Sequence, residues 1–508
     1  MPTLTINGKE ITVDPGTTVL RAAAMLGIDI PHFCYHPALS VPANCRMCLV
    51  EIEKARKLEP SCYAKVGEGM VVHTESPKVI AARRAVLEFI LVNHPVDCPI
   101  CDQAGECKLQ DYYVAYDSQP SRVAVPKVGK AKAYPIGPRV VFDGERCILC
   151  TRCVRFCDEI TGTSELTVAE RGDHSEIRTF PGKELDNPYS MNVTDICPVG
   201  ALTTRDFRFK CRVWLMSSTD SICTGCAKGC NVHLEHFQGE AQRYRPRFNP
   251  EVNEYWMCDA GRMSYLELHA DRLPSLRVLE DSELSWPRAA RKVAALLGEK
   301  ATGEGVAFVA SAQSSCEGLM AGREFVRTML DDAPVFWTGR PDGDGDAFLI
   351  RADKNPNRAG LAGIFGVEVL AQDAHRLLQE LERGAIRVLY MMDSTLPFTS
   401  DEMKRFRAAV EKLELFVLQA PRRGGLDDLA DVLLPSTTHA EQDGSFVNED
   451  GLLQSFWAAY RPRTQALADW EVFVRLARGA DRELSFSDFE SLHGALHAEQ
   501  GAAQDAGE

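Results

Sequence analysis

The stretch CILCTRCVRFC, residues 147–157, constrains how the chain around it folds. It places three thiols within seven residues, and a distant fourth, Cys197, stands before Pro198. A loop wraps a 4Fe–4S cube with this spacing, whereas zinc sites usually combine two separated ligand pairs. We therefore expect a 4Fe–4S cluster with the ligands Cys147, Cys150, Cys153 and Cys197.

The remaining cysteines sort in the same way. Seventeen of the eighteen lie within residues 34–258, and fifteen of these, with one histidine, form four consecutive four-ligand sets. In the first set, wide loop spacing surrounds a short hook from Cys45 to Cys48, which is typical of 2Fe–2S binding in a plant-type ferredoxin fold. Its first interval is ten residues rather than four. The first set is Cys34, Cys45, Cys48 and Cys62.

The second set includes a histidine. Pro95, Pro99 and Gly105 bend the backbone between its members. A lone histidine near a turn is often a capping or surface residue, but three cysteines leave one corner of a cube open and no spare cysteine lies nearby. We expect a 4Fe–4S cluster with the ligands His94, Cys98, Cys101 and Cys107.

Small residues surround the fourth set. Gly225, Ala227 and Gly229 allow backbone N–H groups to approach cluster sulfur closely. Grouped ligands followed by one distant cysteine again favour 4Fe–4S over zinc. The expected ligands are Cys223, Cys226, Cys230 and Cys258, and the cysteines left over, expected to be free and buried, are Cys157, Cys211 and Cys316.

Four such sites in a row point to electron transfer, because iron–sulfur clusters are one-electron carriers. Disulfides are the first alternative, but the residues after Met1 enter a strand pattern and show no secretory signal, so an oxidising compartment is not expected. Zinc, the second alternative, becomes less favourable with each further set of this spacing. A purely structural scaffold is the third.

Composition limits the class of partner. The 508 residues, 45% apolar and 25% charged, suit a protein of about three or four domains. The net charge of −15 argues against nucleic acid and fits a chain that docks on other proteins. No apolar run reaches the roughly 18 residues of a membrane span. We therefore expect no direct membrane insertion and membrane association only through a partner.

Periodicity predicts an α+β N-terminal half and an α/β C-terminal half. Strands at 3–6 and 10–13 flank Asn7-Gly8 as a hairpin, and Ser76-Pro77 begins a helix. Buried strands at 306–310, 386–392 and 415–418, between helical patterns at 373–383 and 401–412, predict a doubly wound domain. The predicted domains are 1–75 (ferredoxin-like β-grasp, 2Fe–2S), 76–111 (His/Cys 4Fe–4S), 112–139 (linker), 140–212 (ferredoxin-like 4Fe–4S), 217–272 (4Fe–4S), 273–480 (α/β) and 481–508 (tail).

The order of these sites, with NHPVDCPICDQAGEC at 93–107 and CILCTRCVRFC at 147–157, resembles the large iron–sulfur subunit (the G subunit) of NADH:quinone oxidoreductase (respiratory complex I, an NADH dehydrogenase and translocase). The resemblance implies that His94 ligates iron, that Cys157 does not, and that the fourth set is an extra cluster found in some members. It also implies a flavin-bearing partner that oxidises NADH, a ferredoxin-like partner that leads to quinone, and a peripheral position on the cytoplasmic side of the bacterial inner membrane. We find no dinucleotide fingerprint, so NADH oxidation is expected elsewhere.

The C-terminal half resembles molybdopterin-dependent formate dehydrogenases in residues 430–435 and in Glu441, Gly444, Asn448, Glu449 and Gly451. It departs from them in length, and Glu317 rather than histidine follows its one cysteine. We expect a molybdopterin-oxidoreductase-like fold without molybdopterin. Alternative functions are an electron-transfer subunit of an NAD-reducing hydrogenase, an iron hydrogenase, which would need further cysteines downstream, and a formate dehydrogenase.

Overall fold

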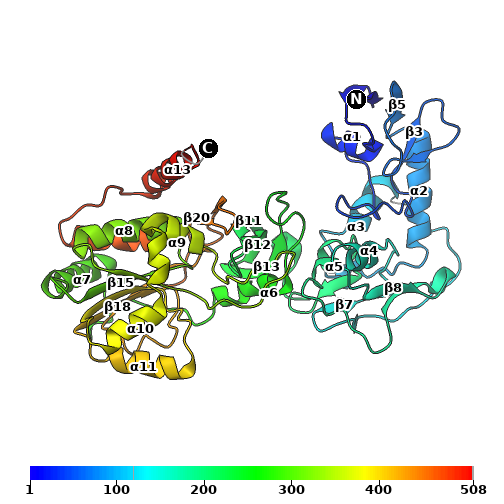
Figure 1. Ribbon diagram of the computed structural model, residues 1–508. Helices are drawn as coiled ribbons and strands as arrows, with labels where there is room; N and C mark the ends of the chain where they lie inside the picture. Colours follow the sequence, from blue (N-terminus) through cyan, green and yellow to red (C-terminus); the bar gives the residue numbers. More distant parts are fainter. Residues whose placement is uncertain (118, 506–508) are drawn as a thin grey trace. The chain divides into compact units, whose positions relative to one another are not determined.

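This computed structural model describes residues 1–117 and 119–505, with side chains up to residue 498. The chain divides into two units, Met1–Met216 and Ser217–Glu508, which run from blue to green and from green to red in Figure 1. Much of the predicted tail at 481–508 forms helix α13 (Phe489–Asp505), and residues 506–508 lie outside the described residues.

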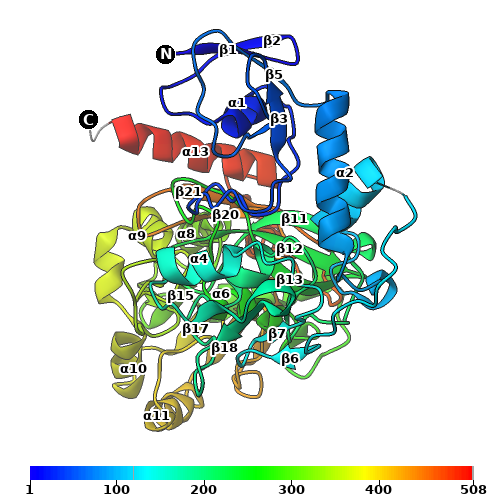
Figure 2. The ribbon, with the colours of Figure 1, turned by 90° about the vertical axis from the view of Figure 1, so that its right-hand side faces the viewer.

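The first unit begins with a β-grasp sheet. β1 and β2 form the predicted hairpin, and Asn7 and Gly8 take the positive φ angles of 49° and 82° that such a turn requires. Thr18 caps helix α1 (Val19–Met25), whose apolar face packs in one core with the strands (Figure 2). The sheet has the order β2-β1-β5-β3-β4, with the strands Thr3–Ile6 (β1), Lys9–Thr12 (β2), Leu49–Ile52 (β3), Glu59–Pro60 (β4) and Met70–His73 (β5).

Helix α2 (Pro77–Leu91) leads into the second ligand set. Ser76 caps its first turn, and Pro77 occupies the first helical position, where a missing N–H costs nothing. At its other end, Lys127 Nζ donates to the carbonyls of Leu91 (2.7 Å) and Val92 (3.0 Å). Three short elements follow: η1 (Cys98–Ile100), α3 (Lys108–Tyr112) and η2 (Tyr113–Asp117).

A second small sheet carries the third ligand set. Its central strand, β7 (Val140–Phe142), pairs with β10 (Leu202–Thr204) on one side and with β6 (Tyr134–Pro135) on the other. The strand from residue 134 thus joins this sheet, although the sequence places it in a linker. The other elements are α4 (Arg152–Glu159), β8 (Leu166–Ala169), η3 (Gly172–His174), β9 (Glu176–Thr179), α5 (Asn192–Asp195) and η4 (Val213–Leu215).

The second unit begins with an antiparallel sheet that frames the fourth ligand set. Its order is β11-β12-β13, and a separate hairpin, β20-β21, contributes Phe446 and Phe456 to a small core with Ile222 of β11. The bounds are Ser217–Ile222 (β11), Asn231–Phe237 (β12), Glu240–Pro246 (β13), Asp259–Met263 (α6), Ser264–Leu268 (η5), Gly444–Val447 (β20) and Leu453–Phe456 (β21).

The rest of this unit is a six-stranded sheet in the order β14-β19-β18-β17-β15-β16. All neighbours are parallel except β14 and β19. The predicted strands at 306–310, 386–392 and 415–418 form its centre. The strands are Arg277–Val278 (β14), Val306–Ser311 (β15), Val335–Thr338 (β16), Val388–Met392 (β17), Leu415–Ala420 (β18) and Val432–Pro435 (β19).

Helices cover both faces of this sheet, as Figure 1 shows. One core joins the sheet to α7, α8, α12 and α13, and a second joins it to α10 and α11. Two layers of helices on a mostly parallel sheet confirm the predicted doubly wound domain. The helices are Trp286–Lys300 (α7), Cys316–Met329 (α8), Arg358–Phe365 (α9), Ala374–Glu382 (α10), Ser400–Val410 (α11) and Asp469–Gly479 (α12), with η6 at Val367–Ala371.

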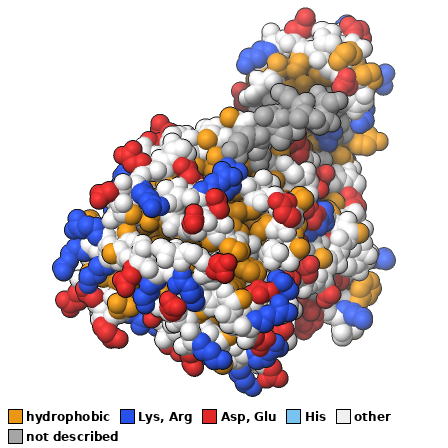
Figure 3. Space-filling view, turned by 60° about the vertical axis from the view of Figure 1, so that its left-hand side comes forward, with side chains coloured by type: hydrophobic (Ala, Val, Ile, Leu, Met, Phe, Trp, Pro, Cys, Tyr) orange, Lys and Arg blue, Asp and Glu red, His pale blue; other side chains and the backbone are white. Residues whose placement is uncertain are grey.

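Acidic and basic side chains are interspersed on the face in Figure 3, with no extended field of one sign. The net charge of −15 is therefore not concentrated on that face. Within the described part of the chain, no helix is both long enough and apolar enough to cross a membrane.

Candidate iron–sulfur sites

The first ligand set lies in the loop between α1 and β3 and just after β4. Cys34 lies beside Cys45, and Cys48 beside Cys62, each pair within hydrogen-bonding distance. The hydrogen bond to its partner, together with burial, raises the pKa of Cys34 and of Cys62 above the ordinary range. Iron binding would replace these protons, since thiolate is the form that binds metal.

The second set lines one cavity at the end of α2. All four predicted residues, His94, Cys98, Cys101 and Cys107, contribute to its wall. Among the described residues, His94 Nδ1 is buried and has no hydrogen-bond partner. Burial, with the charges of Lys127 and Arg146, lowers the pKa of His94 to about 4, so the ring is neutral at ordinary pH. A neutral imidazole with a buried, unpartnered nitrogen suits a metal ligand.

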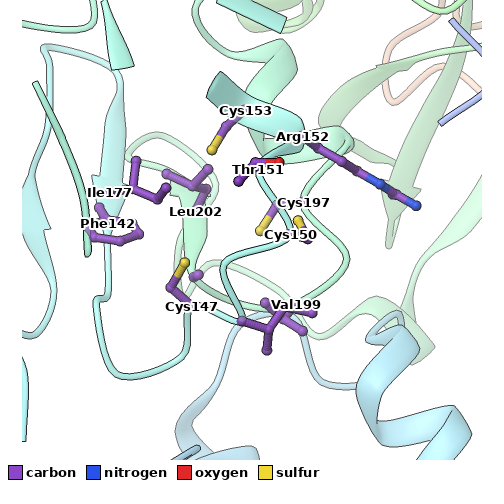
Figure 4. Close-up of a pocket in the computed structure, with 12 residues that line it drawn as sticks. Phe142, Cys147, Cys150, Thr151, Arg152, Cys153, Ile177, Cys197, Val199 and Leu202 are labelled. Atoms are coloured by element: carbon purple, nitrogen blue, oxygen red, sulfur yellow. The ribbon is translucent and has the colours of Figure 1, made fainter. Parts of the chain in front are cut away.

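The third set surrounds a small cavity beneath the first turn of α4. Figure 4 shows the four sulfur atoms around one space, with Phe142, Ile177, Val199 and Leu202 also on its wall. The backbone N–H of Leu149 donates to Cys147 Sγ at 3.4 Å. Burial raises the pKa of Cys197 to about 12. The four sulfur atoms that surround this space are Cys147, Cys150, Cys153 and Cys197.

The fourth set joins β11, the following turn, β12 and α6. Cys223 N donates to Cys230 O at 2.9 Å, which closes the turn, and Cys258 caps α6 with its sulfur, which accepts from Gly261 N at 3.2 Å. A Cβ on Gly261 would lie 2.8 Å from Cys223 Sγ and 3.2 Å from Cys258 Sγ. Only glycine leaves this space free. Cys226 Sγ contacts Leu349 O at 3.9 Å in the same unit.

These donor sets fit iron–sulfur clusters. Each ligand of a 4Fe–4S cube binds a different iron, so four thiolates stand around a space rather than meet at one point. The second and third sets line cavities, and backbone N–H groups donate to sulfur in the third and fourth. Among the residues described, no group of three or more His, Cys, Asp or Glu could hold a single metal ion.

The loops that carry the second and third ligand sets contact each other. Lys108 N donates to Pro198 O at 3.1 Å. A Cβ on Gly200 would lie 2.3 Å from Cys101 Sγ, so glycine is needed for this approach. Arg146, next to Cys147, donates from Nε (3.2 Å) and Nη2 (3.0 Å) to Asp97 Oδ2, next to Cys98. The two ligand sets are therefore in direct contact through their loops.

The first and third sets are joined in the same way. Arg155 Nη2 donates to the carbonyls of Cys34 (2.6 Å) and Cys150 (3.4 Å), which belong to different sets. Asn44 Nδ2 donates to Leu149 O at 3.4 Å. Arg155 is not among the residues that the sequence singled out, although an arginine inside a cysteine motif was a signal that could have pointed to it.

The three cysteines expected to be free lie outside these four sets. Cys157 is buried on α4 and is not part of the wall of the third cavity as described. Cys211 contacts Arg212 O at 3.6 Å and is only partly buried, so the expectation that it is buried is wrong. Cys316 is buried at the start of α8, where its Sγ lies 3.3 Å from Asn357 Oδ1.

A separate polar cavity lies at the carboxyl ends of the parallel strands. Arg340, Asp393, Arg422 and His439 are among its lining residues, and its volume is about 70 Å³. Ligand pockets typically hold roughly 300–1,000 Å³. The volume of this cavity is below that range.

Five family models match the chain. Four describe iron–sulfur domains: "2Fe-2S iron-sulfur cluster binding domain" over residues 1–77, "NADH-ubiquinone oxidoreductase-G iron-sulfur binding region" over 83–122, "NADH-quinone oxidoreductase subunit 3, ferredoxin-like domain" over 137–203, and "NADH-ubiquinone oxidoreductase NDSU1/NuoG-like, 4Fe-4S domain" over 216–266. The fifth, "Molybdopterin oxidoreductase", matches 355–479. They define an iron–sulfur protein with a molybdopterin-oxidoreductase-like domain, as the sequence predicted.

The curated relatives are more specific. The NADH-quinone oxidoreductase G subunit of Rickettsia bellii is 45% identical over 57% of this chain and 43% of its own length. The Rickettsia conorii protein of the same name is 41% identical, over 62% and 47%. The NADH-ubiquinone oxidoreductase 75 kDa subunit of Reclinomonas americana is 44% identical, over 56% and 41%. The chain thus spans less than half the length of these relatives.

These matches confirm the predicted resemblance to the large iron–sulfur subunit of NADH:quinone oxidoreductase. A chain in the crystal structure of an NAD+-reducing [NiFe]-hydrogenase in the H2-reduced state is 30% identical, over 41% of this chain and 90% of that one. Its TM-score of 0.38 is too low to support an argument about the fold.

Proposed function

We propose that this chain carries electrons within an NADH:quinone oxidoreductase, through its first, third and second ligand sets in that order. The observation that carries the proposal is the position of the third set. Its loop contacts the first set through Arg155 and the second through Gly200 and Pro198. The spatial order differs from the order along the chain.

When bound, iron–sulfur clusters would supply one-electron carriers at these positions. We assign the 2Fe–2S cluster to Cys34, Cys45, Cys48 and Cys62, and one 4Fe–4S cluster each to the second, third and fourth sets. The protein residues exclude water from the third set, whose cavity is lined mainly by apolar and sulfur-bearing side chains. The small carboxyl-end cavity supports the proposal that the α/β domain holds no molybdopterin.

The second ligand set reaches the surface, so we propose that electrons leave the chain from this set. Cys98 is exposed and lines a surface hollow with Val114 and Trp214. The apolar side chains that line this hollow are exposed, with Val114 69% and Trp214 61% accessible, and Val96, two residues before Cys98, is 86% accessible. An exposed ligand inside an apolar patch is suited to a partner that carries its own cluster. We assign this face to the ferredoxin-like subunit that leads to quinone, and the first set to the flavin-bearing subunit that oxidises NADH.

The fourth set is proposed to be structural. Its turn is held by residues of the α/β domain of the same unit: Arg340 Nη1 donates to Thr224 O at 3.0 Å, and Gln454 Nε2 donates to Gly229 O at 3.0 Å. The free energy of metal binding there would stabilise the folded state of this domain. Docking on partners would place the chain on the cytoplasmic side of a bacterial inner membrane.

The order of the sets can be tested in the purified complex. Cys153→Ala should remove the third cluster alone, and freeze-quench EPR after NADH addition should then show the first cluster reduced and the second still oxidised. Cys226→Ala, which removes the fourth cluster, is the matched control and should leave reduction of the second cluster unchanged. Reduction of the second cluster at the parent rate without the third would refute the proposed path.

A further inference from the structure

One face of helix α4 holds the loop of the first ligand set. Arg152, Arg155 and Glu159 are three and four residues apart, a spacing that aligns side chains on one side of a helix. Glu159 accepts from Ser40 N at 2.8 Å. On the same helix, Cys153 faces the cavity of the third set, and Figure 4 shows the Arg152 side chain directed away from that cavity. Helix α4 therefore lies between the two sets.

Arg155 makes the closest connection. Besides the carbonyls of Cys34 and Cys150, its guanidinium contacts Ser40 O through Nη1, and its Nε lies 3.5 Å from Thr151 Oγ1. The residue is only 9% exposed. Because guanidinium is planar and rigid, donors fixed on carbonyls of both loops leave little freedom for the loops to separate.

Arg152 repeats the connection one turn earlier. Its Nη1 donates to Ile196 O, next to Cys197, at 3.0 Å, and its Nη2 donates to Tyr35 O, next to Cys34. Its Nε is buried and has no hydrogen-bond partner in the described part of the chain. Two arginines thus link residues 34–40 to both ends of the third set.

The positive charges of Arg152 and Arg155 are not neutralised by a neighbouring carboxylate among the described residues. Over the described residues, all the acceptors of both guanidinium groups are backbone carbonyls and one hydroxyl, and neither arginine forms an ion pair with a carboxylate. Arg155 donates to a carbonyl of each ligand set, and Arg152 donates to carbonyls next to a ligand of each set, so both sets contact the same pair of cations.

We propose that Arg152 and Arg155, the arginine bridge, are positioning residues that hold the first and third ligand sets at a fixed separation and favour reduction at both. The inference rests on the proposed function. One electron would pass from the first set to the third with no bond made or broken. No proton need accompany it, because arginine stays charged at every working pH. The positive bridge would stabilise the added negative charge on either side.

The test uses three variants of the full chain with its clusters assembled. Arg155→Met removes the charge and the hydrogen bonds, and Arg155→Lys keeps the charge but loses the planar fork. Arg178→Met is the matched control, since Arg178 is a half-exposed arginine of β9 in the same unit that bonds to Glu176 at 3.0 Å. Midpoint potentials are measured by mediated redox titration with EPR detection, without NADH or quinone.

In Arg155→Met, the potentials of the first and third clusters should both fall, while those of the second and fourth stay at the parent values. The magnetic interaction between the first and third clusters should weaken. Arg155→Lys should restore the potentials but not the full interaction. Arg178→Met should change neither.

Unchanged potentials in Arg155→Met at full iron content would overturn the inference. If Arg155→Met loses iron from the first set, Arg155→Lys decides: parent-like potentials with a weakened interaction support the bridge, and a fully parent-like interaction overturns it. Because no NADH is present, failure of this test leaves the proposed function standing. Failure of NADH to reduce the parent complex would instead sink the proposed function.

Discussion

Replacing Gly200 by alanine tests the contact between the second and third ligand sets. Gly200 has no positive φ, so the backbone accepts alanine and the effect is steric alone. The added Cβ would lie 2.3 Å from Cys101 Sγ and 3.0 Å from Gln103 Cβ. Since non-bonded atoms of this size prefer roughly 3.5–4.0 Å, Cys101 must move by about 1 Å.

A displacement of that size is several times what a metal ligand tolerates, about 0.2 Å. Overpacking of this kind typically costs about 1–3 kcal/mol, which the unit can absorb without unfolding. Gly200→Ala should therefore lose only the second cluster, about four of roughly 14 irons per chain. The first, third and fourth clusters should remain.

Iron analysis and EPR of anaerobically purified protein measure this loss. Gly67→Ala is the matched control, because Gly67 also lacks a positive φ and its Cβ would meet only Met70 Cε, at 3.6 Å. The control should keep full iron content. Retention of all four clusters in Gly200→Ala would refute the contact between Gly200 and the ligand Cys101.

Substitutions at three further positions test which individual residues are ligands and what each cluster does. His94→Ala should lose or degrade the second cluster, whereas His94→Cys should keep it and lower its potential by supplying an anionic ligand; unchanged spectra and potential in both would remove His94 from the ligands. Cys157→Ala should keep full iron content, and a loss of about four irons would show that Cys157 is a ligand. Cys226→Ala should reduce the amount of assembled complex but not its NADH:quinone rate per flavin, and a collapse of that rate would place the fourth cluster on the path.

The sequence predicted the turns, helix starts and buried strands that short stretches of residues determine. The Asn7-Gly8 turn and the Ser76-Pro77 helix start lie where the sequence indicates. The central strands of the large sheet follow from their apolar runs, because both faces of a parallel sheet are buried. Edge strands such as β14, only two residues long, carry no such signal.

Candidate ligands could be predicted from spacing, but the spatial order of the ligand sets could not. That order depends on contacts between residues far apart in sequence, such as Arg155 with Cys34 and Gly200 with Cys101. A glycine that must leave room for a sulfur atom looks like any loop glycine until the fold brings the two together. Arg152 was visible inside the motif, as was Arg155, but their acceptors are mainly backbone carbonyls, which carry no sequence signature.

The metal content of the anaerobically purified chain decides whether the four ligand sets hold iron–sulfur clusters. One 2Fe–2S cluster and three 4Fe–4S clusters predict about 14 irons per chain, with matching acid-labile sulfide and little zinc or molybdenum. Stoichiometric molybdenum with formate oxidation, or zinc in place of iron at these sites, would contradict the proposed electron-transfer function.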